Sequence, residues 1–135
     1  MRFFQRTRKI SLVKARRKMY KQLSAKAAKG DIRAMYHLAK LFYREKDKRY
    51  YSTIFKWVNV LSTKTKDPSV WMMLGDLFFF GCGTKKNWEK ALECYEKSLS
   101  EAIVLGKDTP LSLEMHTYVE KQILRLRKAS SEKTN

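Results

Sequence analysis

Residues 34–43 read AMYHLAKLFY, and residues 70–79, which lie 36 positions further along the chain, read VWMMLGDLFF. In each stretch apolar residues recur four, seven and eight positions after the first, which is the spacing of one face of an α-helix. The aligned pairs are Leu38 and Leu74, Ala39 and Gly75, Leu41 and Leu77, and Phe42 and Phe78. An internal repeat with this period predicts two copies of one helical unit.

Each repeated stretch follows an aspartate that can cap a helix. Asp31 precedes the first stretch, and Asp67 with Pro68 precedes the second. An aspartate accepts the free amide hydrogens of a first helical turn, and proline suits the first helical position. A further apolar stripe at helical spacing occurs once before the first unit and once within each unit. These stripes are Tyr20, Leu23, Ser24 and Ala27; Ile54, Trp57, Val58 and Leu61; and Ala91, Cys94, Tyr95 and Ser98.

The composition favours long helices over strands. Proline occurs only twice in 135 residues, while Lys, Leu, Ala and Glu are abundant, and a hydrophobic content of 44% is enough for one folded domain. We predict an all-α fold, a short α/α superhelical solenoid of two helix pairs with flanking helices at both ends. The expected segments are a domain at 1–129 made of a basic N-terminal helix at 1–29, a first repeat at 30–66, a second repeat at 67–106 and a C-terminal capping helix at 109–129, followed by a flexible tail at 130–135.

Several residues are expected to set the distance between the helices. Gly75 and Ala39 would allow close approach, whereas Trp57, Tyr95 and Trp88 would fill the space between layers. The aromatic and Met-rich run at 71–80 is larger than one core stripe needs. Two readings of this run stay open, core packing alone and a partly exposed contact patch.

The net charge of +17 lies in the first half of the chain. Residues 1–66 hold 20 Lys or Arg against three acidic residues, and residues 67–135 hold 10 of each sign. Such a field attracts anionic partners. The predicted basic patch consists of Arg2, Arg6, Arg8, Lys9, Lys14, Arg16, Arg17, Lys18 and Lys21. One reading of this patch is contact with an acidic protein, and the alternative is binding of nucleic acid or another anionic surface.

The sequence contains no stretch that is typical of a transmembrane helix or a secretory signal. The longest apolar run, residues 70–80, is interrupted by Gly75 and Asp76 and is far shorter than the roughly 20 residues that span a bilayer. We therefore expect a cytoplasmic protein without a transmembrane segment, and the acid-free, Arg-rich start leaves a mitochondrial presequence as an alternative. Cys82 and Cys94 are expected to be reduced, with a bridge between them as the alternative.

No catalytic, cofactor or metal motif is visible. His37 and His116 have no ligand partners at a recognisable spacing, and the chain lacks a phosphate-binding glycine loop, a dinucleotide fingerprint and a nucleophile elbow. We therefore expect no enzymatic activity, no cofactor and no bound metal.

The second unit carries a specific combination of motifs. Residues 74–83, LGDLFFFGCG, give a Leu-Gly helix and a Gly-x-Gly turn, and residues 87–97, NWEKALECYEK, give a Lys-Ala-x-x-x-Tyr helix. In this order they resemble the Sel1-like repeat family, which is related to the tetratricopeptide repeats, and residues 26–31 resemble its junction between units. The first unit departs from the pattern, with Ala39 in place of glycine and residues 44–47, REKD, in place of the Gly-x-Gly turn.

This resemblance implies a function in protein–protein interaction. Sel1-like repeats are scaffolds, which implies a bacterial, non-enzymatic adaptor or regulator that binds an acidic or amphipathic protein segment, including inhibitors and immunity-type proteins. In such relatives the first helix of each pair lines a groove. The groove residues implied here are Arg33, Tyr36, His37, Lys40, Arg44, Met72, Asp76 and Phe79.

Overall fold

The computed structural model describes the backbone of residues 2–134 and the side chains of residues 8, 9 and 11–132. Residues 2–134 contain α-helices, two short 3₁₀ helices and no strand, so the predicted all-α class is confirmed. The elements are α1 (Arg2–Ala28), α2 (Ile32–Glu45), η1 (Lys48–Tyr50), α3 (Tyr51–Lys64), α4 (Pro68–Phe80), α5 (Trp88–Leu105), η2 (Gly106–Asp108) and α6 (Leu113–Thr134). None of these helices combines the length and the apolar character that crossing a lipid bilayer requires.

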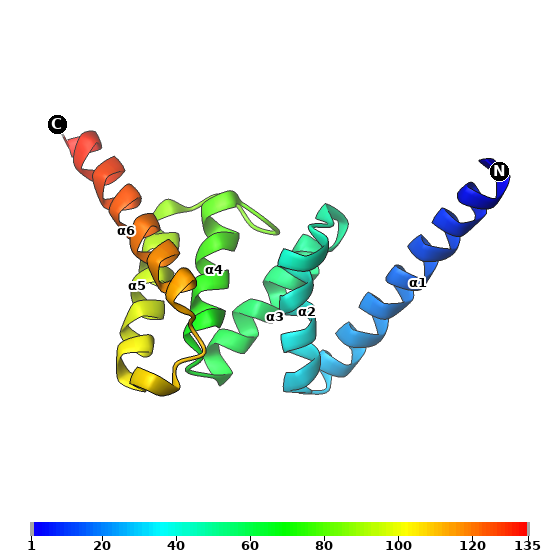
Figure 1. The fold of residues 1–135 in the computed structure, drawn as a ribbon, viewed down its shortest axis with the longest axis horizontal. Coiled ribbons are helices and arrows are strands. Elements are labelled where there is room, and N and C mark those ends of the chain that lie inside the picture. Colours follow the sequence, from blue (N-terminus) through cyan, green and yellow to red (C-terminus); the bar gives the residue numbers. More distant parts are fainter. Residues whose placement is uncertain (1, 135) are drawn as a thin grey trace.

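The α-helices pack in the order in which they occur along the chain. α1 contacts α2, and the contacts continue pairwise through α3, α4 and α5 to α6. Figure 1 shows α1 and α6 at opposite ends of this row, with both chain termini directed away from the body. The helices α2 and α3 correspond to the first predicted unit, and α4 and α5 correspond to the second.

The two predicted aspartate caps are present. Asp31 Oδ1 accepts a hydrogen bond from the Ala34 amide at 3.2 Å, and Asp67 Oδ1 accepts one from the Ser69 amide at 2.8 Å. Each accepts an amide hydrogen that would otherwise lack an acceptor in the first turn of α2 or α4. These aspartates therefore set the starts of both repeated helices.

The ends of the two repeated helices use different residues for the same backbone conformation. Gly81 directly follows α4 and has the left-handed φ of 69° that glycine favours. Lys46 directly follows α2 and adopts a left-handed φ of 51° although it carries a side chain. Asp47 then caps η1 through the Arg49 amide. The first unit thus makes its turn without the Gly-x-Gly of the second.

The last helix differs from its predicted bounds at both ends. The predicted helix starts at Thr109, a capping residue followed by Pro110, but α6 begins at Leu113. Thr109 Oγ1 accepts from the Leu111 amide in a turn, and Ser112 Oγ accepts from the Met115 amide as the cap of α6. The helix then continues to Thr134, through most of the segment that was expected to be a flexible tail.

The interior consists of two apolar clusters on either side of α4. The first joins α1, α2, α3 and α4 and includes Cys94 of α5, and the second joins α4, α5 and α6. α4 contributes Leu74 and Leu77 to the first cluster and Met72 and Phe79 to the second, while Phe78 packs against both. Because α4 is covered on two faces, it buries more apolar side chains than one stripe would allow. The core reading of residues 71–80 therefore holds for most of them, and Phe80 is the exposed exception.

Trp88 does not fill the space between layers as expected. Its side chain is 42% exposed and stacks on Phe79 at the start of α5, with 5.7 Å between ring centroids. Trp57 and Tyr95 are buried, in agreement with the sequence. Trp88 lies at the first position of α5, at the surface of the protein.

Gly75 allows α4 and α5 to approach closely, as the sequence predicts. A Cβ atom at this position would lie 2.6 Å from Tyr95 Cε1, and the Tyr95 side chain is completely buried. We expect Gly75→Ala to destabilise the protein, because overpacking costs about 1–3 kcal/mol while alanine gains only about 1 kcal/mol of helix propensity. Urea unfolding followed by circular dichroism measures the change. Ser100→Ala, at an exposed position of α5, should leave stability unchanged or slightly raised, and an equal effect of both substitutions would contradict the packing of Gly75 on Tyr95.

Candidate functional site

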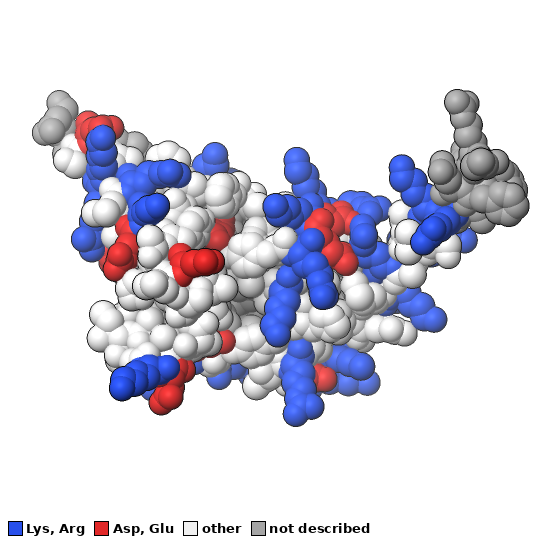
Figure 2. All heavy atoms as spheres, viewed as in Figure 1, with Lys and Arg blue, Asp and Glu red and all other residues white. Residues whose placement is uncertain are grey.

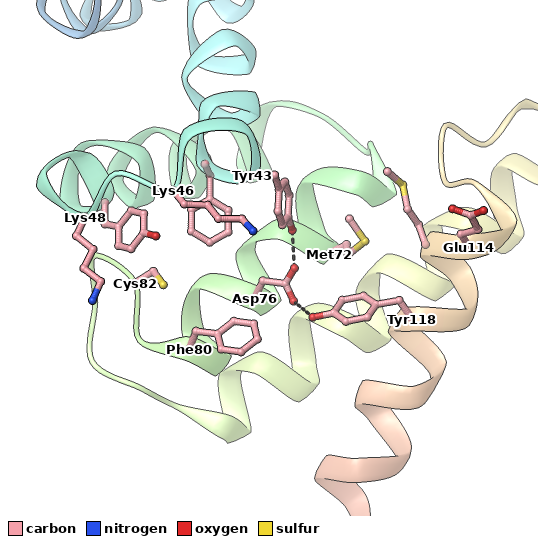
Figure 3. A pocket seen from close by; sticks show the side chains of 12 residues that line it. Tyr43, Lys46, Lys48, Met72, Asp76, Phe80, Cys82, Glu114 and Tyr118 are labelled. Atoms are coloured by element: carbon pink, nitrogen blue, oxygen red, sulfur yellow. Dashed lines mark hydrogen bonds between the residues drawn. The ribbon is translucent and has the colours of Figure 1, made fainter. Parts of the chain in front are cut away.

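A pocket of about 760 Å³ opens between the C-terminal end of α2, the centre of α4 and the start of α6. Aromatic and sulfur-containing side chains form most of its wall (Figure 3). The lining residues are Phe42, Tyr43, Lys46, Lys48, Tyr51, Met72, Asp76, Phe80, Cys82, Glu114, Met115 and Tyr118. The pocket therefore joins both repeated units and the last helix.

Asp76 lies at the back of this pocket and is only 3% exposed. Its Oδ2 accepts a hydrogen bond from the Tyr43 hydroxyl at 2.5 Å, and its Oδ1 accepts from the Tyr118 hydroxyl at 2.7 Å. The Tyr95 hydroxyl also donates to Oδ1, at 2.5 Å, and in turn accepts from Gln122 Nε2. One carboxylate thus connects α2, α4, α5 and α6.

Hydroxyl groups, not cations, compensate the buried carboxylate. Among the described side chains, none of the ion pairs involves Asp76. Burial raises the pKa of Asp76 above its ordinary value, and the three hydroxyl donors act in the opposite direction. Burial and the Asp76 charge raise the pKa of both Tyr43 and Tyr95, so these hydroxyls stay protonated and remain donors at neutral pH.

The mouth of the pocket presents large apolar side chains to solvent. Phe80 is 56% exposed and Met115 is 39% exposed, while Tyr43 is 40% exposed although its hydroxyl reaches Asp76. Figure 3 shows Lys46 and Lys48 on one side of Asp76 and Glu114 on the other. An apolar wall with a few placed charges is typical of a binding site.

The structure separates the predicted groove residues into three places. Met72 and Asp76 line the pocket, and Phe79 is buried against Trp88 and the second cluster. The remaining residues line a different hollow of about 600 Å³ on α2. They are Arg33, Tyr36, His37, Lys40 and Arg44. The eight residues therefore do not form one continuous groove.

Tyr36 has a structural contact within the α2 hollow. Its hydroxyl lies 3.0 Å from Asp67 Oδ2 and 3.3 Å from Thr65 Oγ1, which ties α2 to the cap of α4. Arg33, His37, Lys40 and Arg44 are exposed and form no ion pair among the described side chains. The hollow is thus a basic surface beside Tyr36, whose hydroxyl holds α2 against the start of α4.

The predicted basic patch lies along α1. Arg8, Lys9, Lys14, Arg17, Lys18 and Lys21 are exposed, and the side chains of Arg2 and Arg6 lie outside the described residues. Arg16 is different, because its Nε lies 3.1 Å from Glu45 Oε2 and its Nη1 lies 3.5 Å from Asp47 Oδ2. Figure 2 shows Lys and Arg side chains gathered over the half of the molecule that contains α1, α2 and α3.

Neither thiol is poised for chemistry at neutral pH. Cys82 and Cys94 are both free, and only Cys82 lines the pocket. Burial raises the pKa of Cys94 to about 12 and also raises that of Cys82, so both favour the protonated form. The pocket can therefore hold a ligand by apolar contact and charge, and its thiol is not activated.

Sequence reasoning missed most of the pocket. Phe80 was recognised as part of an apolar run, but Tyr51, Cys82, Met115 and Tyr118 were not linked to any site. One signal was available, since an aspartate inside the apolar stretch 70–80 must be hydrogen-bonded if it is buried. Its partners lie 19, 33 and 42 residues away, so local spacing could not identify them.

No protein-family model matches this chain, and a search of curated proteins found no significant relative.

Proposed function

We propose that this protein is a non-enzymatic adaptor or regulator that binds an acidic or amphipathic protein segment in the pocket around Asp76. The observation that carries the proposal is the pocket itself, with an aromatic wall, exposed Phe80 and Met115 at its mouth, and lysines on one side. Its volume of about 760 Å³ falls within the range of about 300–1,000 Å³ that is typical of ligand sites.

The wall favours an apolar anchor from a partner. Binding energy in protein interfaces is concentrated in a few large side chains that fill desolvated pockets. Met72 and Met115 are unbranched and adaptable, so they can adjust to such an anchor. The Asp76 oxygens already accept three hydroxyl hydrogens, which leaves apolar contact as the main source of affinity.

The charges around the mouth favour an acidic segment. Lys46 and Lys48 are exposed, and the chain as a whole carries a net charge of +17. An acidic residue beside the apolar anchor would meet these lysines, which steers association and sets orientation. Glu114 on the other side would disfavour a second acidic residue there.

The resemblance to Sel1-like repeats supports the same class of function and stays a prediction. The two-pair solenoid, the bacterial origin, the cytoplasmic location and the assignment to inhibitors or immunity-type proteins also stay predictions. The agreement of the buried stripes with the 36-residue repeat supports the paired-helix part of that prediction, because Leu38 and Leu74 are both buried at corresponding positions of α2 and α4.

Affinity capture from nuclease-treated native extract at physiological salt tests the proposal. Wild type and Phe80→Asp are compared, with Ile103→Asp as the matched control because Ile103 is 74% exposed and lies outside the pocket. We expect wild type and the control to recover one protein in stoichiometric amount and Phe80→Asp to lose it by at least about tenfold, as loss of an interface anchor costs about 2 kcal/mol. Equal recovery by all three proteins would contradict docking at this pocket.

A further inference from the structure

The outward face of α1 is a strongly charged surface that pocket binding does not use. Lys14, Arg17, Lys18 and Lys21 are exposed and recur at the spacing of a single helix face. We call these four residues the α1 stripe. On a helix that rises about 1.5 Å per residue they place four positive charges within about 10.5 Å along the axis.

The opposite face of α1 fixes the helix to the body. Tyr20, Leu23 and Ala27 are buried in the first cluster, and the Tyr20 ring stacks on Tyr50 with 3.7 Å between centroids. Arg16 adds its contacts to Glu45 and Asp47 on the same side. The α1 stripe is therefore held outward by contacts that do not include any of its members.

No carboxylate among the described side chains pairs with the α1 stripe. Among the described side chains of α1, only Arg16 forms an ion pair. The chain has no acidic residue before Asp31, so α1 contains no carboxylate on any face. Mutually repelling cations without partners cost stability and attract a polyanion.

We infer that the α1 stripe binds the sugar-phosphate backbone of nucleic acid. This binding goes beyond the proposed function and involves residues outside the pocket. A nucleic-acid strand carries one negative charge on each phosphate, at regular intervals. A row of cations on successive helical turns can neutralise these charges. α1 would lie along the backbone with its stripe toward the phosphates while its other face stays on α2.

Two other anionic partners fit this face less well. A helix that lies on a membrane needs an apolar stripe opposite its charged face. Along the C-terminal half of α1 that face is buried in the first cluster through Tyr20, Leu23 and Ala27, and Leu12 is its exposed large apolar residue among the described side chains. A protein interface needs a large apolar or aromatic anchor, whereas the described side chains beside the stripe on its face are those of Ser11, Ala25 and Ala28. Phosphate binding requires only the charges.

Fluorescence anisotropy with a labelled DNA duplex and a single-stranded RNA of the same length tests the inference. The stripe variant carries Lys14→Gln, Arg17→Gln, Lys18→Gln and Lys21→Gln. The matched control carries Lys64→Gln, Lys66→Gln, Lys85→Gln and Lys86→Gln, which removes the same charge from exposed positions outside α1. Vesicles containing phosphatidylserine serve as the probe for an anionic membrane.

We expect wild type to bind at least one of the two nucleic acids, with affinity that falls on raising salt from about 50 to about 200 mM. Four phosphate contacts account for a decrease on the order of 10²-fold over that range, and the stripe variant should lose this part of the salt dependence. The control should stay within about threefold of wild type. A variant with Lys14→Arg, Lys18→Arg and Lys21→Arg keeps the charges and should keep the affinity.

Three results would overturn the inference. They are equal losses in the stripe and control variants, binding of vesicles without binding of either nucleic acid, and loss of binding in the charge-preserving variant. Phe80→Asp should bind nucleic acid like wild type, so failure of pocket docking and failure of phosphate binding are distinguished. The comparison between duplex DNA and RNA shows which backbone is preferred.

Discussion

Replacing Asp76 with alanine is expected to lower the free energy of unfolding by about 3 kcal/mol or more. The substitution removes the acceptor for three tyrosine hydroxyls, and each buried donor left without a partner costs about 1–3 kcal/mol. Tyr43 and Tyr118 border the pocket and can be hydrated, but Tyr95 is completely buried. Urea unfolding at neutral pH, followed by circular dichroism, measures the loss.

A double variant separates this cause from simple loss of volume. Asp76→Ala combined with Tyr95→Phe removes both the acceptor and the buried donor, and removal of both partners costs less than removal of one. We expect the double variant to be more stable than Asp76→Ala alone. If Tyr95→Phe instead adds a further loss, the hydroxyl is not the source of the effect.

The pH dependence of stability gives a second readout for Asp76. Because its pKa is raised in the folded protein, the proton binds more tightly to the native state than to the unfolded chain. The contribution of Asp76 to the free energy of unfolding is fully present below the ordinary aspartate pKa of about 3.9. It is lost as the pH rises through the pKa that Asp76 has in the folded protein. The stability of wild type relative to Asp76→Asn should therefore decrease as the pH rises from about 4, and an increase would contradict the direction of the shift.

Replacing Trp57 with alanine is expected to cost about 3–5 kcal/mol, because it leaves a large cavity in the first cluster. The Trp57 side chain is only 8% exposed and belongs to the core that joins α1, α2, α3 and α4. A domain of this size has about 5–15 kcal/mol of stability in total, so the variant should melt more than about 10 °C below wild type. Differential scanning calorimetry measures this difference.

Trp88→Ala is the matched control for that substitution. It removes the same side chain from a position that is 42% exposed, where the ring stacks on Phe79 at the surface. We expect a loss of about 1 kcal/mol, since stacked aromatic pairs contribute about 0.5–1.5 kcal/mol beyond burial. Similar losses at the two positions would show that Trp88 fills the space between layers, as predicted from the sequence.

The features that sequence reasoning predicted correctly depend on short-range spacing. Leu38 and Leu74 follow a helical period, and Asp31 and Asp67 lie directly before the helices that they cap, so local pattern was sufficient. The start of α6 shows the limit of such cues, because Thr109 and Pro110 form a turn and Ser112 provides the actual cap. Two capping residues three positions apart cannot be distinguished by residue type alone.

The pocket depends on long-range placement that no local pattern encodes. Tyr118 reaches Asp76 because α6 packs on α5 beside α4, and the two residues are 42 positions apart. The sequence also placed Phe79 in a groove, whereas α5 and α6 cover that face of α4 and leave Phe80 exposed instead. A shift of one residue on a helix changes direction by about 100°, so the choice between these neighbours required the packing of the last helix.

The central claim is that the pocket around Asp76 is the docking surface, and site-specific photo-crosslinking tests it most directly. A photoreactive phenylalanine analogue in place of Phe80 is compared in the native cell with the same analogue in place of Ile103. We expect position 80 to capture one protein through a segment that combines apolar and acidic residues, and position 103 to capture none of it. Capture of the same protein from position 103 with equal yield, or of no protein from position 80, would contradict the claim.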